Sequence, residues 1–576
     1  MKTVNSRRLH AIATVVLSLA SFACAQQAAK VSCAAGTTEY EVSLQGREKH
    51  ILRVRAVFAP SSRGERTIQL PVWNATYQVR DFAQNVFSMF AEDEQGKPLS
   101  VMKIEKSLWR IAAPRERGCV AAEYEIYLDE AGPFSAQVNA EHAFINWAQA
   151  LVYSPEERGN RVRIRVVDLP STWKVRDAYV FANAAEAGAL AVDGEAANYD
   201  MLVDSPVEMG TFAETTITEG GARYQVVVHG DATAYDMKKL SEALQKLAAA
   251  ETDWMQDRPF DRYTFIYHFP RGPAGGGMEH SYSTAIDVSA DRIQQNPLAF
   301  ASVSAHEFFH LWNVKRIRPA TLEPVDYAKE MYTRALWFSE GVTSAVQEYM
   351  LVRSGLNDEA TFLQNLGRQI STLQERPAHQ AQSVEESSLD AWLEKYPFYA
   401  QPDRSISYYN KGQIVGVLLD LKIREATHGA KSLRDVFHYL NENYAKKHLY
   451  FDDSEGIRKA TEAVSGADLR DFFSRYVAGT EEIPYDEFLR GVGLRVVKKP
   501  TRVPYAGFTI GRAIGRTPTI ATVDPGSPAE QAGVAVGDVL VAVNGKLVTG
   551  NANAALSALQ PGELATLKFR GRSGDR

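Results

Sequence analysis

The feature that most constrains this chain is the histidine pair in residues 306–310, which read His-Glu-Phe-Phe-His. Residues 296–297 are Asn-Pro, a favoured N-cap followed by a favoured first helical residue, so we predict a helix that begins there and carries the motif. Positions four apart share one face of a helix, so His306 and His310 can bind one metal ion. Glu307 is next to a ligand and can reach a water on that ion.

This pattern is the one that zinc peptidases use, two imidazoles plus a general base. Two histidines hydrogen-bonded within an apolar helix are the alternative. A zinc site of this kind needs a third protein ligand and leaves one position for water. We predict Glu340 as that ligand, at the start of an apolar helix that ends at Gly355. A carboxylate buried there needs a cationic partner, although the helix dipole also favours a first-turn Glu.

An export signal is predicted over residues 1–25. Three basic residues precede the apolar run 11–23, which is too short to span a membrane, and residues 23–25 form a small-residue cleavage site. Cys24 also suggests a lipoprotein anchor, but Ser21 stands where such signals normally have a large aliphatic residue. We therefore expect a periplasmic or secreted protein without a transmembrane segment.

Cleavage after residue 25 would lower the net charge from −6 to −9, because it removes Lys2, Arg7 and Arg8. An acidic protein of this kind is not expected to bind nucleic acid. Two cysteines would remain, Cys33 and Cys119. They form either one disulfide or two free buried thiols, and the sequence alone leaves both open.

The 576 residues predict several domains in a multidomain α+β protein. Alternating polar and apolar residues predict an N-terminal antiparallel β domain over residues 26–175. A catalytic domain that becomes mainly helical follows over residues 176–495. A linker at 496–504 precedes a β module at 505–576, rich in glycine turns.

Residues 306–319 and 337–341 together resemble the bacterial glycyl aminopeptidases, gluzincins related to aminopeptidase N. The resemblance extends over nearly the whole mature chain. It implies a thermolysin-like catalytic domain and one Zn²⁺ per chain. It also implies the removal of an N-terminal glycine or alanine from peptides.

Two further motifs are similar to this family. In residues 276–280, Gly-Gly-Met-Glu-His, the resemblance assigns Glu279 to the free α-amino group of the substrate, and the rest of the substrate-binding set is Gly276, Gly277, Met278 and His280. His280 departs from the asparagine of the relatives. Residues 409–412 resemble a Tyr-x-Lys-Gly element whose tyrosine stabilises the oxyanion. This implies a catalytic role for Tyr409, for which Tyr408 is a competitor.

Residues 526–545 resemble a PDZ domain, with a short helix capped by Ser527 and a hairpin turn at Asn544-Gly545. Upstream, the resemblance assigns the binding of a peptide C-terminus to the loop formed by Tyr505, Ala506, Gly507 and Phe508. A PDZ fold that binds nothing is the alternative. The family usually has one more strand beyond residue 576, so we expect a truncated module.

The sequence thus predicts an exported zinc aminopeptidase that acts on peptides with a free N-terminus. A zinc endopeptidase, in which Glu279 is only structural, is the alternative within the enzyme class. A PDZ peptide-binding protein with a degenerate active site is the alternative outside it.

Overall fold

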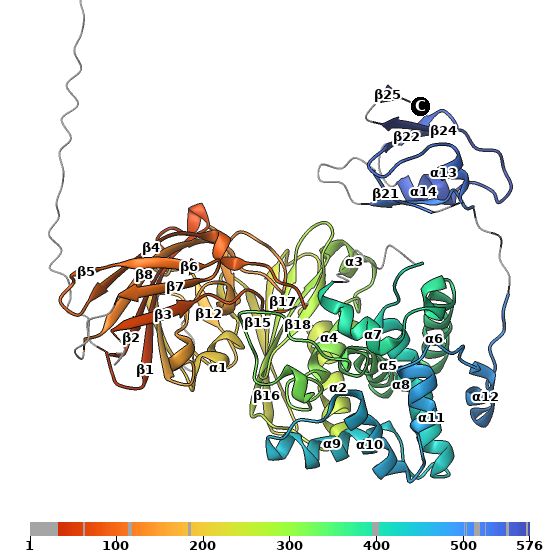
Figure 1. Ribbon diagram of the computed structural model, residues 1–576, viewed down its shortest axis with the longest axis horizontal. Helices are drawn as coiled ribbons and strands as arrows, with labels where there is room; N and C mark the ends of the chain where they lie inside the picture. Colours follow the sequence, from red (N-terminus) through yellow and green to blue (C-terminus); the bar gives the residue numbers. More distant parts are fainter. Residues whose placement is uncertain are drawn as a thin grey trace, which may run out of the picture.

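The computed structural model describes residues 33–575 apart from 61–63, 76, 113–117, 182–185, 394–402, 500–501, 503, 512–518, 525, 549–551 and 572–573. The predicted export signal at 1–25 and part of the predicted linker lie outside the described residues. The described parts form a β-rich N-terminal region, a mixed and then helical central region and a small C-terminal β module (Figure 1). The predicted multidomain α+β class is confirmed.

The described residues of the N-terminal region form three sheets. A seven-stranded sheet has the order β13-β11-β1-β2-β8-β4-β5, a four-stranded sheet β12-β14-β10-β9 and a three-stranded sheet β3-β7-β6. Their bounds are β1 (Thr37–Ser43), β2 (Ile51–Phe58), β3 (Glu65–Gln69), β4 (Val86–Asp93), β5 (Pro98–Leu99), β6 (Val101–Glu105), β7 (Leu108–Ala112), β8 (Val120–Tyr127), β9 (Gln137–Val138), β10 (His142–Ile145), β11 (Arg161–Val167), β12 (Lys174–Arg176), β13 (Ala191–Ala196) and β14 (Val207–Gly210).

Two details differ from the predicted antiparallel domain at 26–175. Strands β1 and β11 pair in parallel, because the long segment between them allows a return in the same direction. Strands β13 and β14 belong to the N-terminal sheets although they follow residue 175, so the predicted boundary falls inside the β region. Cys33 and Cys119 form a disulfide, which decides the question that the sequence left open.

The central region begins with a five-stranded sheet of order β15-β16-β17-β19-β18, in which β18 lies at the edge. Strands β16, β17 and β19 pair in parallel, and β15 and β18 pair antiparallel to their neighbours. The bounds are β15 (Ala213–Glu219), β16 (Ala222–Gly230), β17 (Arg262–Phe269), β18 (Gly275–Glu279) and β19 (Ser283–Val288).

Helices fill the rest of this region. They are α2 (Met237–Met255), α3 (Ala290–Gln295), α4 (Ala301–Phe309), α5 (Thr343–Arg353), α6 (Glu359–Gln374), α7 (Val384–Leu389), α8 (Tyr408–Ala426), α9 (Leu433–Asn443), α10 (Asp453–Ser465), α11 (Arg470–Phe472) and α12 (Tyr485–Leu489). Helix α1 (Tyr199–Val203) instead packs in the core of the N-terminal region. A π-helical turn, η6 (Trp337–Val342), precedes α5.

Helix α4 carries residues 306–309 but begins later than predicted. Asn296 caps only a local turn, in which its side chain accepts a hydrogen bond from the Leu298 main chain at 3.1 Å. Residues 297–300 form that turn, and the helix starts at Ala301. His310 occupies the C-cap with φ −60°, so its side chain still lies one turn beyond His306.

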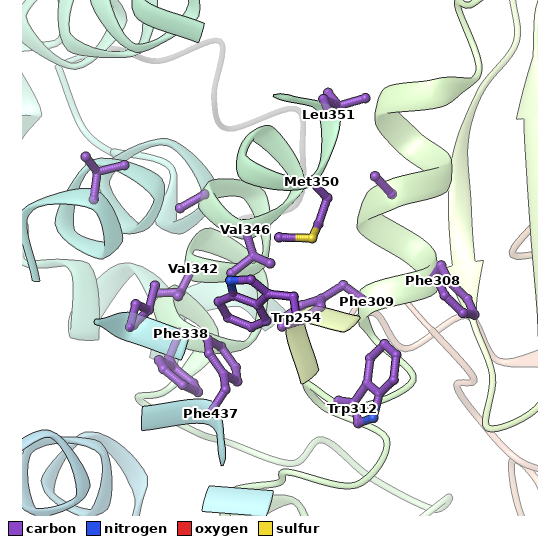
Figure 2. Close-up of a cluster of buried hydrophobic side chains, with 14 of the residues drawn as sticks. Trp254, Phe308, Phe309, Trp312, Phe338, Val342, Val346, Met350, Leu351 and Phe437 are labelled. Atoms are coloured by element: carbon purple, nitrogen blue, oxygen red, sulfur yellow. The ribbon is translucent and has the colours of Figure 1, made fainter. Parts of the chain in front are cut away.

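The face of α4 opposite the histidines is anchored in the main hydrophobic core (Figure 2). Phe309 packs its ring 5.5 Å from Trp254 of α2 and 5.1 Å from Phe437 of α9. Phe338 of η6 stacks on the same Phe437 ring at 5.1 Å. One apolar cluster therefore fixes both the histidine helix and the segment that carries Glu340.

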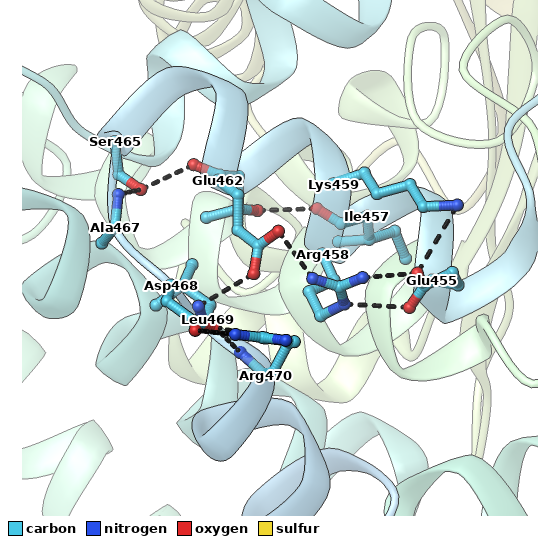
Figure 3. A network of polar contacts seen from close by, with 11 residues as sticks. Glu455, Ile457, Arg458, Lys459, Glu462, Ser465, Ala467, Asp468, Leu469 and Arg470 are labelled. Carbon is cyan, nitrogen blue, oxygen red and sulfur yellow. Dashed lines mark hydrogen bonds and ion pairs between the residues drawn. The ribbon is translucent and has the colours of Figure 1, made fainter.

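A polar network holds the turn after α10 (Figure 3). Arg458 binds Glu462 at 2.6 Å and also pairs with Glu455. The second oxygen of Glu462 accepts the main-chain N–H of Leu469 at 2.9 Å. Besides these ion pairs, the network thus caps the main-chain N–H of Leu469 at the turn.

The C-terminal module has the sheet order β20-β21-β22-β24-β25, with β23 paired to β22. Its elements are β20 (Phe508–Gly511), β21 (Thr519–Val523), α13 (Pro528–Gln531), β22 (Val539–Val543), β23 (Lys546–Leu547), α14 (Ala552–Ser557), β24 (Leu567–Gly571) and β25 (Gly574–Asp575). As predicted, Ser527 caps α13 by accepting from the Glu530 N–H. Asn544 and Gly545 both have positive φ, which fits a tight hairpin turn.

None of the helices in the described parts of the chain is long and apolar enough to cross a membrane.

Candidate metal centre and active-site cleft

A cleft of about 280 Å³ lies where the N-terminal β region meets the central region. Strand β18, helix α4, η6 and the start of α8 form one side. Residues of the N-terminal region form the other, among them Trp73, Asn74, Tyr77 and Phe134. Most of the residues that the sequence singled out reach this cleft, namely Gly277, Met278, Glu279, His306, Glu307, His310, Glu340 and Tyr409.

The two histidines and Glu340 converge in the cleft. Glu340 Oε2 lies 3.3 Å from His306 Nε2 and 3.2 Å from His310 Nε2. All three side chains are buried, with Glu340 only 4% exposed. Ligand-type atoms of these residues lie within 4.8 Å of one another, so the three could hold one metal ion.

The remaining ring nitrogens define how the imidazoles are oriented. His310 Nδ1 donates to the main-chain oxygen of Asn313 at 2.6 Å. His306 Nδ1 lies 3.4 Å from Ser344 Oγ, whose own hydroxyl donates to the Glu340 main chain. These contacts leave the Nε2 lone pairs of neutral imidazoles facing a carboxylate, an unfavourable contact unless a cation or proton lies between them. The donor set therefore fits a zinc ion.

The electrostatics of the cluster point to the same need for positive charge. Burial lowers the pKa of His310, but the carboxylates, Glu340 foremost, outweigh burial and raise it to about 10. Burial raises the pKa of Glu340, yet His310 and His306 outweigh it and hold that pKa well below its usual range. Burial also raises the pKa of Glu307, and the positive charge of His310 offsets this effect only in part, because the carboxylates of Glu279 and Glu340 add to it.

Glycine packing brings Glu340 and Tyr409 to the same place. A Cβ on Gly341 would lie 2.5 Å from Gly412 Cα, and one on Gly412 would lie 2.5 Å from the Trp337 oxygen. The η6 turn and α8 therefore approach more closely than any side chain would allow. The extra residue of a π turn, a feature frequent at functional sites, lies in the segment that carries Glu340.

Strand β18 lies against the end of α4 that carries His306 and Glu307. Oxygens of Glu279 and Glu307 and a nitrogen of His310 lie within 4.8 Å of one another. A Cβ on Gly277 would lie 2.4 Å from the Glu307 side chain. Glycine at 277 thus gives the Glu307 carboxyl the space in which it lies.

Two members of the predicted substrate-binding set lie off the cleft. Gly276 packs beneath the Phe134 ring, where a Cβ would come within 3.2 Å. His280 is fully buried and its Nδ1 lies 3.2 Å from Asp204, which also binds Lys315. His280 therefore has a structural place in this network, and its substitution for the family asparagine does not alter the cleft lining.

Tyr409, not Tyr408, lines the cleft. The Tyr409 ring lies 6.0 Å from that of His306. Tyr408 is only 5% exposed and stacks behind Tyr409 at 4.9 Å. This arrangement favours Tyr409 in the competition that the sequence left open.

Sequence reasoning missed the contribution of the N-terminal region to the cleft. Trp73, Tyr77 and Phe134 carry no motif, and only the folded structure brings them opposite β18. It also missed Val314, a β-branched residue with φ 130° that lines the cleft. Such a backbone conformation is rare for valine and marks strain next to the proposed ligand His310.

In the C-terminal module, Gly507 has φ 80° and its oxygen accepts from Ser527 Oγ at 3.1 Å. A Cβ on Gly507 would lie 2.1 Å from the Ser527 Cβ. The loop at 505–508 leads into β20, which lies at one edge of its sheet among the described strands. An edge strand of this kind offers unpaired main-chain groups to a peptide.

Comparison with known proteins follows this architecture. Residues 299–415 match the M61 glycyl aminopeptidase family, residues 39–211 the peptidase M61 N-terminal domain and residues 519–571 a PDZ domain. No curated protein matches this chain.

Among solved structures, an aminopeptidase N family protein from Idiomarina loihiensis is 25% identical with a TM-score of 0.83, covering 94% of this chain and 95% of that one. An M1 zinc metallopeptidase from Deinococcus radiodurans has a TM-score of 0.50 at 13% identity, covers 78% of this chain and 94% of its own, and shows the fold alone.

The fold and the cleft define a peptidase, a hydrolase of peptide bonds. The chain belongs to the M61 glycyl aminopeptidase family and carries a PDZ domain.

The space at Gly277 gives a direct test of how Glu307 is positioned. Gly277→Ala should lower kcat/KM about 100-fold, because the new methyl group displaces the Glu307 carboxyl and small misplacements are costly in catalysis. The melting temperature should change little, since only a side-chain end must move. Gly275→Ala is the matched control, because a Cβ there meets nothing within 4 Å. Equal activity in both variants would show that Glu307 is not held by this contact.

Proposed function

We propose that this protein is an exported zinc aminopeptidase that removes an N-terminal glycine, or alanine, from peptides. The observation that carries the proposal is the closeness of Glu279 to Glu307 and His310, within 4.8 Å. In an amino acid, only Cα separates the α-amino nitrogen from the carbonyl carbon. An ammonium bound by Glu279 therefore leaves room for one residue before the bond that is cut.

His306, His310 and Glu340 would hold the zinc ion, and when bound it would polarise the scissile carbonyl and acidify the attacking water. Asn313 and Ser344 orient the two imidazoles through their other ring nitrogens. Proton transfer and stabilisation of the oxyanion are then carried out by protein side chains.

Glu307 acts as the general base and then as the general acid. Its carboxylate takes a proton from the attacking water and passes it to the leaving amine as the C–N bond breaks. Burial beside Gly277 excludes solvent from this carboxyl. The Tyr409 hydroxyl donates a hydrogen bond to the oxyanion that forms at the scissile carbonyl.

Other residues of the cleft are consistent with a substrate that has a free N-terminal ammonium and a small first residue. Glu279 supplies a negative charge at the end of β18, and a charge-assisted hydrogen bond to the ammonium would fix the substrate end. Phe134 covers Gly276 behind that strand, and Trp73 and Tyr77 face the cleft from the N-terminal region. A peptide could extend along the edge strand β18.

The C-terminal module would bind a peptide C-terminus through the main chain of Tyr505, Ala506, Gly507 and Phe508, with the peptide added beside β20. The Cys33–Cys119 disulfide supports export, since such bonds persist in oxidising compartments.

The base and the ligands should separate in mutants. Glu307→Gln should keep the zinc and lose about 10²–10⁴-fold in kcat, because it removes proton transfer but no ligand. His306→Ala should lose both metal at this site and activity. Metal content measured by mass spectrometry beside kcat checks both. Loss of zinc from the Glu307→Gln protein would contradict the assigned roles.

Tyr409→Phe should lower kcat far more than it raises KM, because the hydroxyl acts mainly in the transition state. One lost oxyanion donor costs on the order of 3 kcal/mol. Tyr408→Phe is the matched control, since Tyr408 does not line the cleft. Normal kcat in Tyr409→Phe with a loss in Tyr408→Phe would transfer the role to the neighbour.

Exopeptidase character is tested by kcat/KM for a glycyl peptide with a free or an N-acetylated amine. The wild type should cleave the free form and almost none of the acetylated form. Glu279→Ala should lose most of the free-amine reaction and with it most of that preference, while Glu279→Gln keeps the size and removes the charge. Equal cleavage of both peptides by the wild type would favour an endopeptidase instead.

A further inference from the structure

A second buried cluster of imidazoles and carboxylates lies outside the active-site cleft. It consists of His142 on β10, Glu208 on β14 and His268 on β17. Ligand-type atoms of the three residues lie within 4.8 Å of one another, as they do in the proposed catalytic site. The proposed function leaves this cluster without a role.

The two imidazoles converge on the carboxylate of Glu208. Glu208 is 0% exposed, and both histidines are 7% exposed. Glu208 Oε1 lies 3.1 Å from His142 Nδ1, and Oε2 lies 3.1 Å from His268 Nε2. A buried carboxylate requires compensation by positive charge, and no Lys or Arg of the described residues pairs with Glu208.

The other nitrogen of each ring has an oxygen acceptor of its own. His268 Nδ1 donates to Asp287 Oδ1 at 2.9 Å. His142 Nε2 lies 3.3 Å from Gln137 Oε1. Metal-ligating histidines almost always have such a second partner, which fixes the tautomer and directs the free lone pair to the metal. The arrangement repeats that of His306 and His310 around Glu340, where Ser344 and Asn313 have this part.

A third imidazole packs against the cluster without joining it. His229 stacks on His142 with ring centroids 4.0 Å apart and an interplanar angle of 7°. Two parallel rings cannot both have the same ion in their planes, so His229 is not part of the ligand set. Burial lowers the pKa of His229 to about 4, so a neutral ring packs against His142.

From this geometry we propose that His142, Glu208 and His268 bind a second transition-metal ion, with Zn²⁺ as the expected occupant. Imidazole nitrogen and carboxylate oxygen are ordinary zinc ligands, and three of them leave one position for a water molecule. The proposal does not depend on the proposed peptidase function.

The position of the cluster indicates what such an ion would do. Strands β10 and β14 belong to the four-stranded sheet of the N-terminal region, and β17 belongs to the sheet of the central region. A single ion would therefore join the two sheets, beside a small apolar contact of Phe144, Ile266 and Ala285. Gln137 is three residues after Phe134, so the same hairpin leads to the wall of the cleft. The ion would hold that wall opposite β18.

A proton could take the place of the ion. Burial lowers the pKa of His268, but Asp287 and Glu208 outweigh it and raise that pKa to about 10. A doubly protonated His268 shared by two carboxylates would then account for its contacts without a metal. The two accounts differ in the number of metal ions per chain.

The test uses the full-length protein, dialysed against trace zinc and analysed for bound metal. Wild type should hold two ions per chain, and Glu208→Gln should hold one. The double variant His306→Ala/His310→Ala leaves the second cluster intact and should also hold one ion. The triple variant, which adds Glu208→Gln, should hold none. Glu214→Gln is the matched control, because Glu214 of β15 pairs with Lys174 and Arg176 of β12 and contacts no imidazole.

Two further measurements detect metal at the second cluster directly, so the test does not depend only on the metal content of Glu208→Gln. In the His306→Ala/His310→Ala protein, Co²⁺ should give the visible absorption of a low-symmetry nitrogen and oxygen site, and zinc should raise the melting temperature. Both effects should disappear when Glu208→Gln is added to this double variant. No ion in the His306→Ala/His310→Ala protein would overturn the second site and favour the shared proton. A failed catalytic site would look different, because that double variant would then keep the wild-type metal content.

Discussion

The structure of the active site depends on one contact, the Glu340 carboxylate between two imidazoles whose other nitrogens are already engaged. Neither His306 nor His310 can turn its N–H toward Glu340 without giving up Ser344 or Asn313. Three buried groups therefore present lone pairs to a common point. A cation between the three groups would remove this repulsion. The surrounding core holds the three side chains in place, so they cannot move apart to relieve it.

Two kinds of packing maintain this contact. The aromatic cluster behind α4 fixes the histidines from the apolar side, while the glycine contact between η6 and α8 fixes Glu340 and Tyr409 from the other. Gly277 then leaves the Glu307 carboxyl its space. Protein interiors are packed densely enough that each of these positions is felt by the next. Catalytic geometry here is a consequence of where side chains are absent as much as of where they are present.

Much of the fold and site could be predicted from the sequence, because the signals are local. The spacing of His306 and His310 needs only helical periodicity, and the Ser527 cap and the Asn544-Gly545 turn need only neighbouring residues. The start of α4 was predicted wrongly, because Asn296 caps a turn and tertiary packing begins the helix at Ala301. His280 was placed with the substrate because its motif resembles a family pattern, whereas Asp204 holds it elsewhere.

The sequence by itself predicted which groups could bind a metal and accept a proton, since these follow from residue type and short spacing, whereas the proposed role of Glu279 came from the family resemblance. The tertiary structure alone decided what faces what. Tyr409 rather than Tyr408 reaches the cleft, and Phe134 closes it from a distant domain. His142, Glu208 and His268 meet although no spacing relates them, because pairing between strands and packing between sheets join residues regardless of their separation along the chain.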